Sequence, residues 1–306
     1  MMFSKIISVG SFLPKRELLN KDLPAELETS DEWISTRTGI KKRYVVDGHQ
    51  QTSDLALQAL VNSGFDLAQL EGLIIATSTP DQAMPSTASI VQGKLALKLQ
   101  VAFDINVACA GFVNALAVAD GLIKSKTVKN IAVVGAETMT RTVDWSDRST
   151  CVLFGDGAGC VILSQADTPG VVASLMGSDN KSVEILGIKP NLKLHMNGKE
   201  VFKMAVEQLS ANALAILSQN SLTIDQVDWI VPHQANIRII SAVAERINCP
   251  MEKFAVTADI HANTSAASIP LAFDRYLKEG KIKKGQTILF TAIGAGMTWG
   301  SVLVKY

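Results

Sequence analysis

The sequence predicts an α/β fold built from two similar halves. Runs rich in β-branched and other apolar residues alternate with stretches of helical periodicity along most of the 306 residues, a pattern typical of α/β proteins. Apolar residues make up 47% of the chain. That fraction fills a large core and excludes a disordered or collagen-like protein. A shift of the first half by 154 positions also aligns like elements with like elements, which indicates an internal duplication.

The expected strands and helices follow one another in a regular order. Strands are expected at residues 73–78, 130–137, 160–164, 229–233, 254–260, 287–293 and 301–306. Helices are expected at residues 52–62, 86–98, 111–126, 200–219 and 237–247. Strands joined by helical crossovers favour largely parallel sheets. The runs 160–164 and 301–306 each follow a glycine turn instead of a helix, so we expect them to be antiparallel additions at the sheet edges.

The internal repeat divides the chain in two. The shift of 154 positions pairs Ala108 with Ala262, Cys109 with Asn263, Asp120 with Asp274, Lys124 with Lys278 and Lys129 with Lys283. The identities are few, so the agreement between element order and spacing is the stronger evidence. We predict two halves, 1–165 and 166–306. No Pro- or Ser-rich linker separates them, so we expect one shared body.

Cys109 is the first candidate for chemistry. It precedes the helix expected at 111–126, among the small residues Ala108, Ala110 and Gly111. That helix is apolar on nearly every face, which predicts full burial. A side chain at its start would therefore sit deep, beside unpaired backbone amides. The positive end of a helix lowers the pKa of a nearby thiol. Most free cysteines are small core residues, but this placement favours a nucleophile.

Two further polar residues stand at strand ends. His233 ends the run 229–233 and precedes a helix, and ligands gather at the carboxyl ends of parallel strands. Asn263 takes the place of Cys109 in the repeat, where packing alone would favour an apolar side chain. Helix capping is the structural alternative for Asn263. Of the other histidines, we expect His261 to support the site, and we see no partner for His49 or His195.

Charge and composition exclude several classes of protein. Lys+Arg and Asp+Glu both number 29, so the formal net charge is zero, and nothing favours a nucleic-acid partner. The mean hydropathy of +0.22 predicts extensive burial or an oligomer interface. Every long apolar stretch is interrupted, so we expect neither a membrane span nor a membrane partner. The first residues show no secretory signal, and we expect a cytoplasmic location.

The cysteines do not form a recognisable metal or disulfide motif. Cys109, Cys151, Cys160 and Cys249 include no CxxC and no Cys–His pair at ligand spacing, so we expect no disulfide, no metal and no resident cofactor. The order Cys, His, Asn also occurs in papain-like proteases, but their signature around the cysteine is missing. The glycine run 155–159 leads into a strand instead of a helix, which argues against a dinucleotide site.

Motifs along the whole chain carry a family resemblance. They read TSDEWISTRTGIKKR (29–43), TSTPDQAMPSTAS (77–89), ACAGF (108–112), DRSTCVLFGDGAG (147–159), GKEVFK (198–203), VPHQANIRII (231–240), HANTSAASIP (261–270) and GAGMTWGS (294–301). Together they resemble the β-ketoacyl-[acyl-carrier-protein] synthase III family of the thiolase-like condensing enzymes. The resemblance implies a five-layered αβαβα fold of two duplicated halves related by a pseudo-twofold, in agreement with the repeat.

The resemblance implies a decarboxylating Claisen condensation. An acyl-CoA starter, expected to be acetyl-CoA, would acylate Cys109. Malonyl-[acyl-carrier-protein] would then lose CO2 and attack the acyl group, giving a 3-oxoacyl-[acyl-carrier-protein] and initiating type II fatty acid biosynthesis. His233 and Asn263 would donate hydrogen bonds to the malonyl thioester oxygen, a task that needs neither a base nor a metal. The backbone amides of Cys109 and Gly296 would form the oxyanion hole.

Contacts with both substrates are implied as well. Trp33 and Arg148 would sandwich the adenine of coenzyme A, and Arg37 would lie near its phosphates. The rest of the coenzyme A site would comprise Thr29, Gly198, Phe202 and Asn236. The acyl carrier protein would contact Gln234, Arg238 and Lys203, with Lys199 nearby. The structural alternatives are an ordinary surface position for Trp33 and solvated salt bridges for the arginines.

The acyl pocket departs from the family pattern. Met84 and Ile293 are expected to border it, Met84 by reaching across a homodimer into the partner's pocket. Met297 stands where Phe is common, and flexible methionines fill irregular space, so we expect room for starters longer or more branched than acetyl. Two alternatives remain: a sister enzyme that takes other starters, and a non-catalytic thioester-binding scaffold. The presence of Cys109, His233 and Asn263 disfavours the scaffold.

Overall fold

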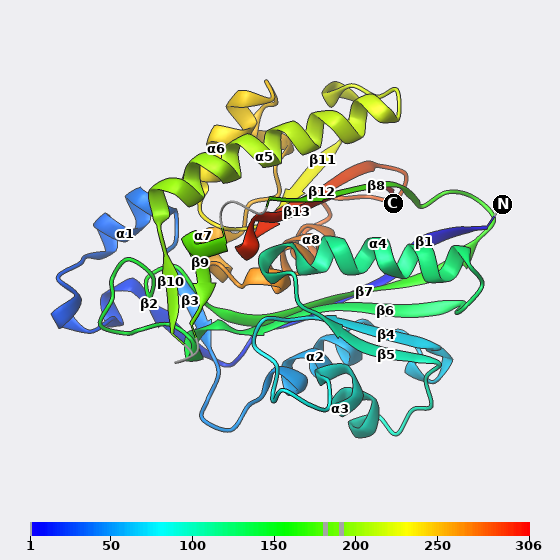
Figure 1. The fold of residues 1–306 in the computed structure, drawn as a ribbon, viewed down its shortest axis with the longest axis horizontal. Coiled ribbons are helices and arrows are strands. Elements are labelled where there is room, and N and C mark those ends of the chain that lie inside the picture. The colour runs from blue at the N-terminus through cyan, green and yellow to red at the C-terminus, as the bar shows by residue number, and fades with distance from the viewer. Residues whose placement is uncertain (1, 180–182, 190–192) are drawn as a thin grey trace.

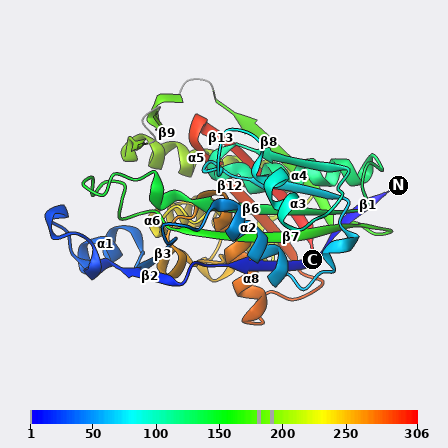
Figure 2. The ribbon, with the colours of Figure 1, turned by 90° about the horizontal axis from the view of Figure 1, so that it is seen from below.

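The computed structural model describes residues 2–179, 183–189 and 193–306. Its two main sheets lie one above the other, with helices between them and on both outer sides (Figure 1). Both termini lie at the end of the molecule opposite helix α1 (Asp31–Thr38) and the hairpin of β2 (Arg16–Leu19) and β3 (Lys42–Val45), as Figures 1 and 2 show. No helix in these described ranges is long and apolar enough to cross a bilayer.

The first sheet combines parallel and antiparallel pairs. Its strand order in the described residues is β1 (Phe3–Phe12), β7 (Asp156–Ala166), β6 (Asn130–Thr138), β4 (Gly72–Ala76) and β5 (Val101–Ile105). β4 pairs in parallel with β5 and β6, whereas β7 pairs antiparallel with β1 and β6. β4 is buried on both faces, as its unbroken apolar run LIIA dictates.

The second sheet repeats this arrangement. Its order is β8 (Val171–Ser178), β13 (Thr298–Lys305), β12 (Thr287–Gly294) and β11 (Trp229–Pro232). β11 and β12 are parallel, and the other two pairs are antiparallel. Phe254 adds a parallel bridge beside Ile230, at the place that β5 occupies in the first sheet. The two sheets therefore share one strand order.

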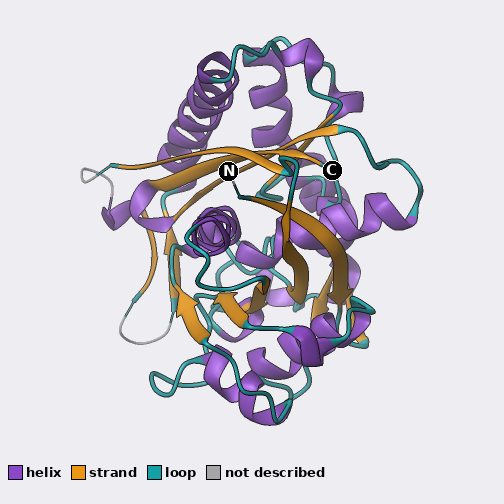
Figure 3. Cartoon of the chain, turned by 90° about the vertical axis from the view of Figure 1, so that its right-hand side faces the viewer, coloured by secondary structure: helices purple, strands orange, loops and turns teal. Residues whose placement is uncertain are grey.

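Helices and sheets alternate in five layers over the described residues. α2 (Thr52–Asn62) and α3 (Thr87–Lys94) cover the outer face of the first sheet. α4 (Gly111–Lys124) and α8 (Ser268–Lys278) lie between the sheets, where one helix is seen end-on in Figure 3. α5 (Gly198–Gln219) and α6 (Ile237–Arg246) form the other outer layer. Alternate strand residues serve alternate layers: Ile74 joins the central core, and Leu73 and Ile75 join the core under α2, as the period of two requires.

Smaller elements complete the end that carries α1. β9 (Leu186–Ile188) and β10 (Leu194–Met196) form an antiparallel hairpin, and α7 (Ala258–His261) is a single helical turn. These segments share a separate apolar cluster that includes Ile34, Leu194 and Ala262. The cluster fixes this end of the molecule to the layered body.

The 154-residue repeat holds in three dimensions. Ala108 and Ala262 both have a positive φ, 46° and 57°, a conformation unusual for alanine. Lys124 and Lys278 close the two central helices, and each lies 2.6 Å from the aspartate four residues earlier. Such agreement in backbone strain and ion pairing supports a duplicated fold. The dividing point at residue 165 stays a prediction; β7 runs one residue past it.

Several expectations about the elements are wrong. The runs 160–164 and 301–306 are antiparallel but internal, because β1 and β8, which the sequence did not predict, pair outside β7 and β13. The sheets are mixed instead of largely parallel for the same reason. The expected strand 254–260 is reduced to the bridge at Phe254, since the chain turns into α7. α4 is buried on every side over Gly111–Leu116 but keeps only one buried face beyond it: Ala119 and Ile123 are buried, and Val118 is 36% exposed.

Candidate active site

A cavity of about 780 Å³ opens between the two halves of the chain. Among the residues that line it are Cys109 from the first half and His233 and Asn263 from the second. The three side chains come from positions after β5, β11 and α7, far apart in sequence. A pocket with converging polar groups is the usual form of a small-molecule site, and this one brings the three predicted residues together.

Cys109 lies in the 3₁₀ turn Ala108–Ala110 between β5 and α4, and it is partly exposed. The turn packs directly against the end of β12. A Cβ atom at Gly294 would lie 2.7 Å from both the Cys109 nitrogen and the Val107 oxygen, so only glycine fits there. The second half of the chain therefore supports the turn that carries the thiol.

The electrostatics of Cys109 differ from the sequence prediction. Although the residue as a whole is partly exposed, desolvation of its thiol at the bottom of the cavity raises the pKa to about 12, and the Glu137 carboxylate adds to the rise, while hydrogen bonding from Ser265 acts in the opposite direction. This rise opposes the preference for the thiolate that the helix start was expected to give. Desolvation disfavours the charged sulfur, so the thiol keeps its proton at neutral pH.

His233 is buried and neutral. Its backbone nitrogen donates to the Thr291 oxygen over 2.8 Å, and its Nδ1 lies 2.7 Å from the Ser268 hydroxyl. Burial lowers the pKa of the imidazole to about 4. The Ser268 oxygen also accepts from the Gln234 nitrogen over 3.3 Å, so its own proton is left for Nδ1. This arrangement favours the tautomer whose Nε2 carries the proton.

Asn263 is fixed by bonds on both sides. Its Oδ1 accepts from the Ser265 nitrogen over 2.9 Å, which is an Asx turn; the capping position of the following 3₁₀ turn is Thr264, so Asn263 is not the helix cap considered as the structural alternative. Its backbone nitrogen and oxygen bond to Leu153 and Gly155 over 2.9 and 3.0 Å. Because Oδ1 is occupied by the turn, the amide nitrogen is the end that can donate. The turn therefore fixes a side chain that also forms part of the cavity wall.

The residues predicted for the adenine and the phosphates of coenzyme A gather at α1. The Arg37 and Arg148 guanidinium carbons lie 4.7 and 5.6 Å from the centre of the Trp33 ring. Arg148 also donates to the Glu28 oxygen over 2.9 Å. The Thr29 hydroxyl is buried with no hydrogen-bond partner among the described residues. A buried hydroxyl without a protein partner calls for another partner, and a bound ligand can supply it.

The other predicted coenzyme A residues line the cavity. Arg37, Gly198, Phe202 and Asn236 are all part of its wall. Phe202 is 40% exposed at the start of α5, and Asn236 caps α6 by accepting from the Ile239 nitrogen over 3.0 Å. The cavity therefore runs from the α1 end to Cys109.

One residue predicted for carrier-protein contact is misplaced. Gln234 is fully buried, and its side chain donates to the Pro232 and Ala255 oxygens and accepts from the Thr257 nitrogen. Its polar atoms are used inside the fold, so it does not reach the surface. Arg238 and Lys203 are exposed, and Arg238 and Lys199 lie in the cavity wall.

The acyl-pocket predictions divide between two places. Ile293 is 7% exposed and lines the cavity, and Met297, four residues later, is buried in the same apolar cluster. Met84 is 82% exposed and lies outside the residues that line this cavity. Gly296, expected in the oxyanion hole, has a positive φ of 72° between the lining residues Ala295 and Thr298.

Some site residues were missed from the sequence. Ser78, Asn106 and Ser265 line the cavity with Cys109. The signal for Ser78 was present, because it follows the apolar run that became β4. Nothing in the sequence singled out Glu137, which is fully buried nearby. His261, expected as a support, is buried outside the lining residues, and its Nδ1 has no partner in the described part of the chain.

Comparison with known proteins agrees with this geometry. The family model of 3-oxoacyl-[acyl-carrier-protein (ACP)] synthase III matches residues 103–180. The model of the C terminal of the same family matches residues 217–306. The chain is 48% identical to beta-ketoacyl-[acyl-carrier-protein] synthase III of Ehrlichia canis (strain Jake), over 99% of each chain. It is 46% identical to that of Neisseria meningitidis serogroup B, over 100% of each. The chain belongs to the β-ketoacyl-[acyl-carrier-protein] synthase III family.

Solved structures of this family share the fold. The crystal structure of 3-oxoacyl-[acyl-carrier-protein] synthase III from Aquifex aeolicus VF5 matches with a TM-score of 0.95 and 44% identity, covering 99% of this chain and 100% of that chain. The enzyme from Thermus thermophilus matches with a TM-score of 0.95 and 38% identity, covering 99% of each. The predicted family, its thiolase-like fold class and its class of enzyme, an acyltransferase of the condensing type, are confirmed.

Proposed function

We propose that this protein condenses an acyl-CoA starter, expected to be acetyl-CoA, with malonyl-[acyl-carrier-protein]. The products are a 3-oxoacyl-[acyl-carrier-protein], CO2 and coenzyme A, in the first step of type II fatty acid biosynthesis. One observation carries the proposal: Cys109, His233 and Asn263 line the same cavity, in a chain that belongs to this family.

The first half of the reaction acylates Cys109. Its sulfur attacks the starter thioester, the new S–C bond forms, and the bond to the coenzyme A sulfur breaks. In net terms the thiol proton ends on coenzyme A. The backbone amides of Cys109 and Gly296 stabilise the oxyanion of the tetrahedral intermediate. Because the resting thiol is protonated, loss of its proton is part of this step.

The second half joins the malonyl group to the acyl enzyme. His233, through Nε2–H, and Asn263, through its amide nitrogen, donate to the malonyl thioester oxygen. The bond to CO2 breaks and leaves its electron pair on the α-carbon as an enolate, which attacks the acyl carbon and expels the Cys109 thiolate. Since His233 is neutral, it acts as a hydrogen-bond donor, and no step needs a resident cofactor or metal.

The substrates enter from the α1 end in this proposal. The adenine lies against Trp33 and Arg148, and the Thr29 hydroxyl, unpaired in the described chain, gains a partner from the pantetheine. Arg37 meets the phosphates, and the exposed side chains of Arg238 and Lys203 meet the acidic carrier protein. Because the net charge is zero, this recognition is local. All four cysteines are free, as suits the reducing cytoplasm we propose for this enzyme.

The experiment that tests the proposal is capture of the acyl enzyme. Incubation with acetyl-CoA is expected to add an acetyl mass to the peptide that contains Cys109, measured by mass spectrometry. The Cys109→Ser variant is expected to lose this adduct, whereas Cys249→Ser, a matched change at a buried cysteine, keeps it. An adduct on the peptides of Cys151, Cys160 or Cys249 would refute the assignment.

Which acyl-CoA starter the protein takes is a separate question. It depends on the acyl pocket, which Ile293 is expected to border and whose cavity it lines. A priming β-ketosynthase from the R1128 polyketide pathway has a TM-score of 0.92 with this chain at 31% identity, so a sister enzyme with another starter is the second candidate. A panel of acyl-CoA starters, each scored by its adduct on Cys109, distinguishes the two. A preference for long or branched acyl groups over acetyl would favour the second candidate.

A further inference from the structure

Glu137 is a buried carboxylate that the proposed reaction does not use. It stands near the end of β6 and is fully buried. Both of its oxygens accept from the Ser78 nitrogen over 3.1 Å, and Oε2 also accepts from the Thr79 and Thr77 hydroxyls over 2.5 and 3.3 Å. The contacts that the described residues make with it include no Lys, Arg or His. Burying a carboxylate without a cation costs free energy that several hydrogen-bond donors must offset. The donors of Ser78, Thr77 and Thr79 do so here, which ties Glu137 closely to this segment.

The bonds of Glu137 lead to the turn that carries Cys109. The Ser78 hydroxyl lies 3.4 Å from Asn106 Oδ1, and that oxygen accepts from the Ala108 nitrogen over 3.3 Å. Ser78 and Asn106 line the cavity together with Cys109. A short chain of side chains therefore joins the carboxylate to the nucleophile's turn.

β6 also presses against the turn that follows Asn263. A Cβ atom at Gly135 would lie 2.2 Å from the Ala266 oxygen, so strand and turn are in direct contact. The Ser265 hydroxyl and the Ala266 backbone both act on the Glu137 carboxylate, and Ser265 acts on the Cys109 thiol as well. Glu137 thus lies behind both halves of the site.

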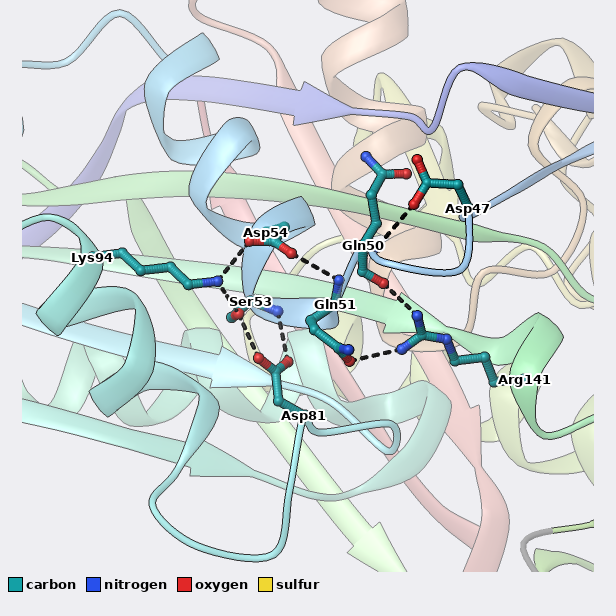
Figure 4. Close-up of polar contacts among 8 residues, drawn as sticks. All are labelled: Asp47, Gln50, Gln51, Ser53, Asp54, Asp81, Lys94 and Arg141. Carbon is teal, nitrogen blue, oxygen red and sulfur yellow. Dashed lines mark hydrogen bonds and ion pairs between the residues drawn. The ribbon is translucent and has the colours of Figure 1, made fainter.

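The opposite side of the Ser78–Thr79 segment is anchored to α2. The Thr52 hydroxyl donates to the Thr79 oxygen, and the Ser53 nitrogen donates to Asp81 Oδ1 over 2.8 Å. Figure 4 shows Asp81 facing Ser53, with Lys94 reaching Ser53 and Asp54. The segment is therefore held by α2 on one side and by Glu137 on the other. Together these bonds set the position of Ser78 in the cavity wall.

We propose that Glu137 is a positioning residue for Cys109: its carboxylate holds the Ser78–Thr79 segment, which is bonded through Asn106 to the turn that carries the nucleophile. The inference deepens the proposed function, because it rests on Cys109 as the nucleophile.

The charge of Glu137 changes near neutral pH. Burial raises the pKa of its carboxyl to about 7, against the hydrogen bonds from Thr79, Ser265 and Ser78, which lower it. Its ionised form raises the pKa of Cys109. The neighbouring acid, Asp156 on β7, has a pKa raised to about 6 and is bonded to Val46 and Thr140, and His233 in the cavity is neutral. Below about pH 7 Glu137 is neutral and the thiol ionises more easily; above it, less easily.

The test is the pH profile of Cys109 alkylation by iodoacetamide, read by mass spectrometry. In the unsubstituted protein the alkylation rate rises with pH as the thiol ionises. The rise becomes less steep in the pH range where Glu137 ionises, because the new charge disfavours the thiolate. In Glu137→Gln that inflection disappears. The ratio of variant to parent rate climbs from about one at low pH to about tenfold above pH 7, if the thiol pKa falls by about one. Asp156→Asn is the matched control, because it removes a neighbouring buried acid but leaves Glu137 in place. The pH profile of this variant is expected to keep the inflection of the parent.

Further variants separate charge from position. Glu137→Asp keeps the charge but shortens the side chain, so it keeps the inflection and slows acylation by acetyl-CoA. If Glu137→Gln does not fold, as circular dichroism reports, Thr79→Val replaces it: loss of one stabilising hydroxyl moves the parent inflection to higher pH. A parent profile with no inflection near pH 7, or identical profiles for parent and Glu137→Gln, overturns the inference. Alkylation uses no natural substrate, so a normal alkylation result with no transfer from acetyl-CoA would refute the proposed function instead.

Discussion

Each of the three residues in the cavity owes its chemical state to its neighbours. Cys109 is a protonated thiol because burial outweighs the donors around it. His233 is a neutral imidazole because burial disfavours its charge, and Ser268 orients its ring. Asn263 offers its amide nitrogen because the turn takes its oxygen. A neutral donor pair beside a protonated thiol suits thioester chemistry that passes through an oxyanion.

The different roles of these residues predict a split between two half-reactions. His233→Ala and Asn263→Ala are expected to keep acylation of Cys109 and to slow CO2 release from malonyl-[acyl-carrier-protein] by about a hundredfold or more, since each removes a donor to the developing enolate. Radiolabelled CO2 release and the Cys109 adduct are measured side by side. Either variant releasing CO2 at the parent rate would exclude that residue from decarboxylation.

Some residue-level predictions failed because burial cannot be seen in a motif. Gln234 follows His233 in the chain, and the family resemblance predicts that it contacts the carrier protein. In the fold its side chain points inward, where it bonds to the backbone of Pro232, Ala255 and Thr257. Glu137 looked like the last residue of an apolar strand. Only the pairing of β6 with β4, which leads into Ser78, brings its carboxylate to the segment bonded to the Cys109 turn.

At the scale of elements, the central layer depends on close backbone contact. β6 meets the turn after Asn263 at Gly135, and β12 meets the Cys109 turn at Gly294. Any side chain at these points would separate a strand from a turn of the other half. The glycines therefore set the spacing of the two halves around the cavity.

This spacing predicts opposite effects for two Gly→Ala changes. Gly135→Ala forces the β6 backbone away from the Ala266 oxygen and is expected to destabilise the protein by about 1–3 kcal/mol or more. Gly121→Ala is the matched control: a Cβ there meets nothing within 4 Å, and the position lies inside α4. It is expected to stabilise the protein by about 0.5–1 kcal/mol. Urea denaturation measures both, and equal midpoints for the two variants would contradict the packing argument.

At the scale of the whole molecule, an open sheet edge points to self-association. β5 is an edge strand of the first sheet, and every residue of β5 is only partly buried. Met84, on the loop before α3, is 82% exposed. An apolar edge of this kind is an association surface unless something covers it. We infer that a second copy of this chain covers it, which is the expected homodimer and would bring Met84 to the partner's acyl pocket.

The dimer is tested by one substitution on the exposed loop before α3 and one on the edge strand β8 of the other sheet. Met84→Asp places a charge in the inferred interface and is expected to weaken the dimer at least about tenfold, because a buried unpaired charge costs several kcal/mol. Val172→Asp is the control, since it is exposed on β8 at the edge of the other sheet. Sedimentation equilibrium gives both affinities. A parent protein that sediments as a monomer, or equal weakening by the two variants, would argue against this interface.

The sequence by itself determined the layered α/β class, the repeat and the three residues of the cavity. Helix α2 occupies the predicted residues 52–62, and the 154-residue shift that paired Cys109 with Asn263 is matched in the backbone at Ala108 and Ala262. These features depend on local periodicity and on spacing, which the chain carries in its order. The tertiary structure alone decided that β1 and β8 close the sheets, that Gln234 is buried, that Cys109 keeps its proton, and that Glu137 lies behind it. Each of these depends on burial between segments distant in sequence, and burial sets both strand partners and pKa values.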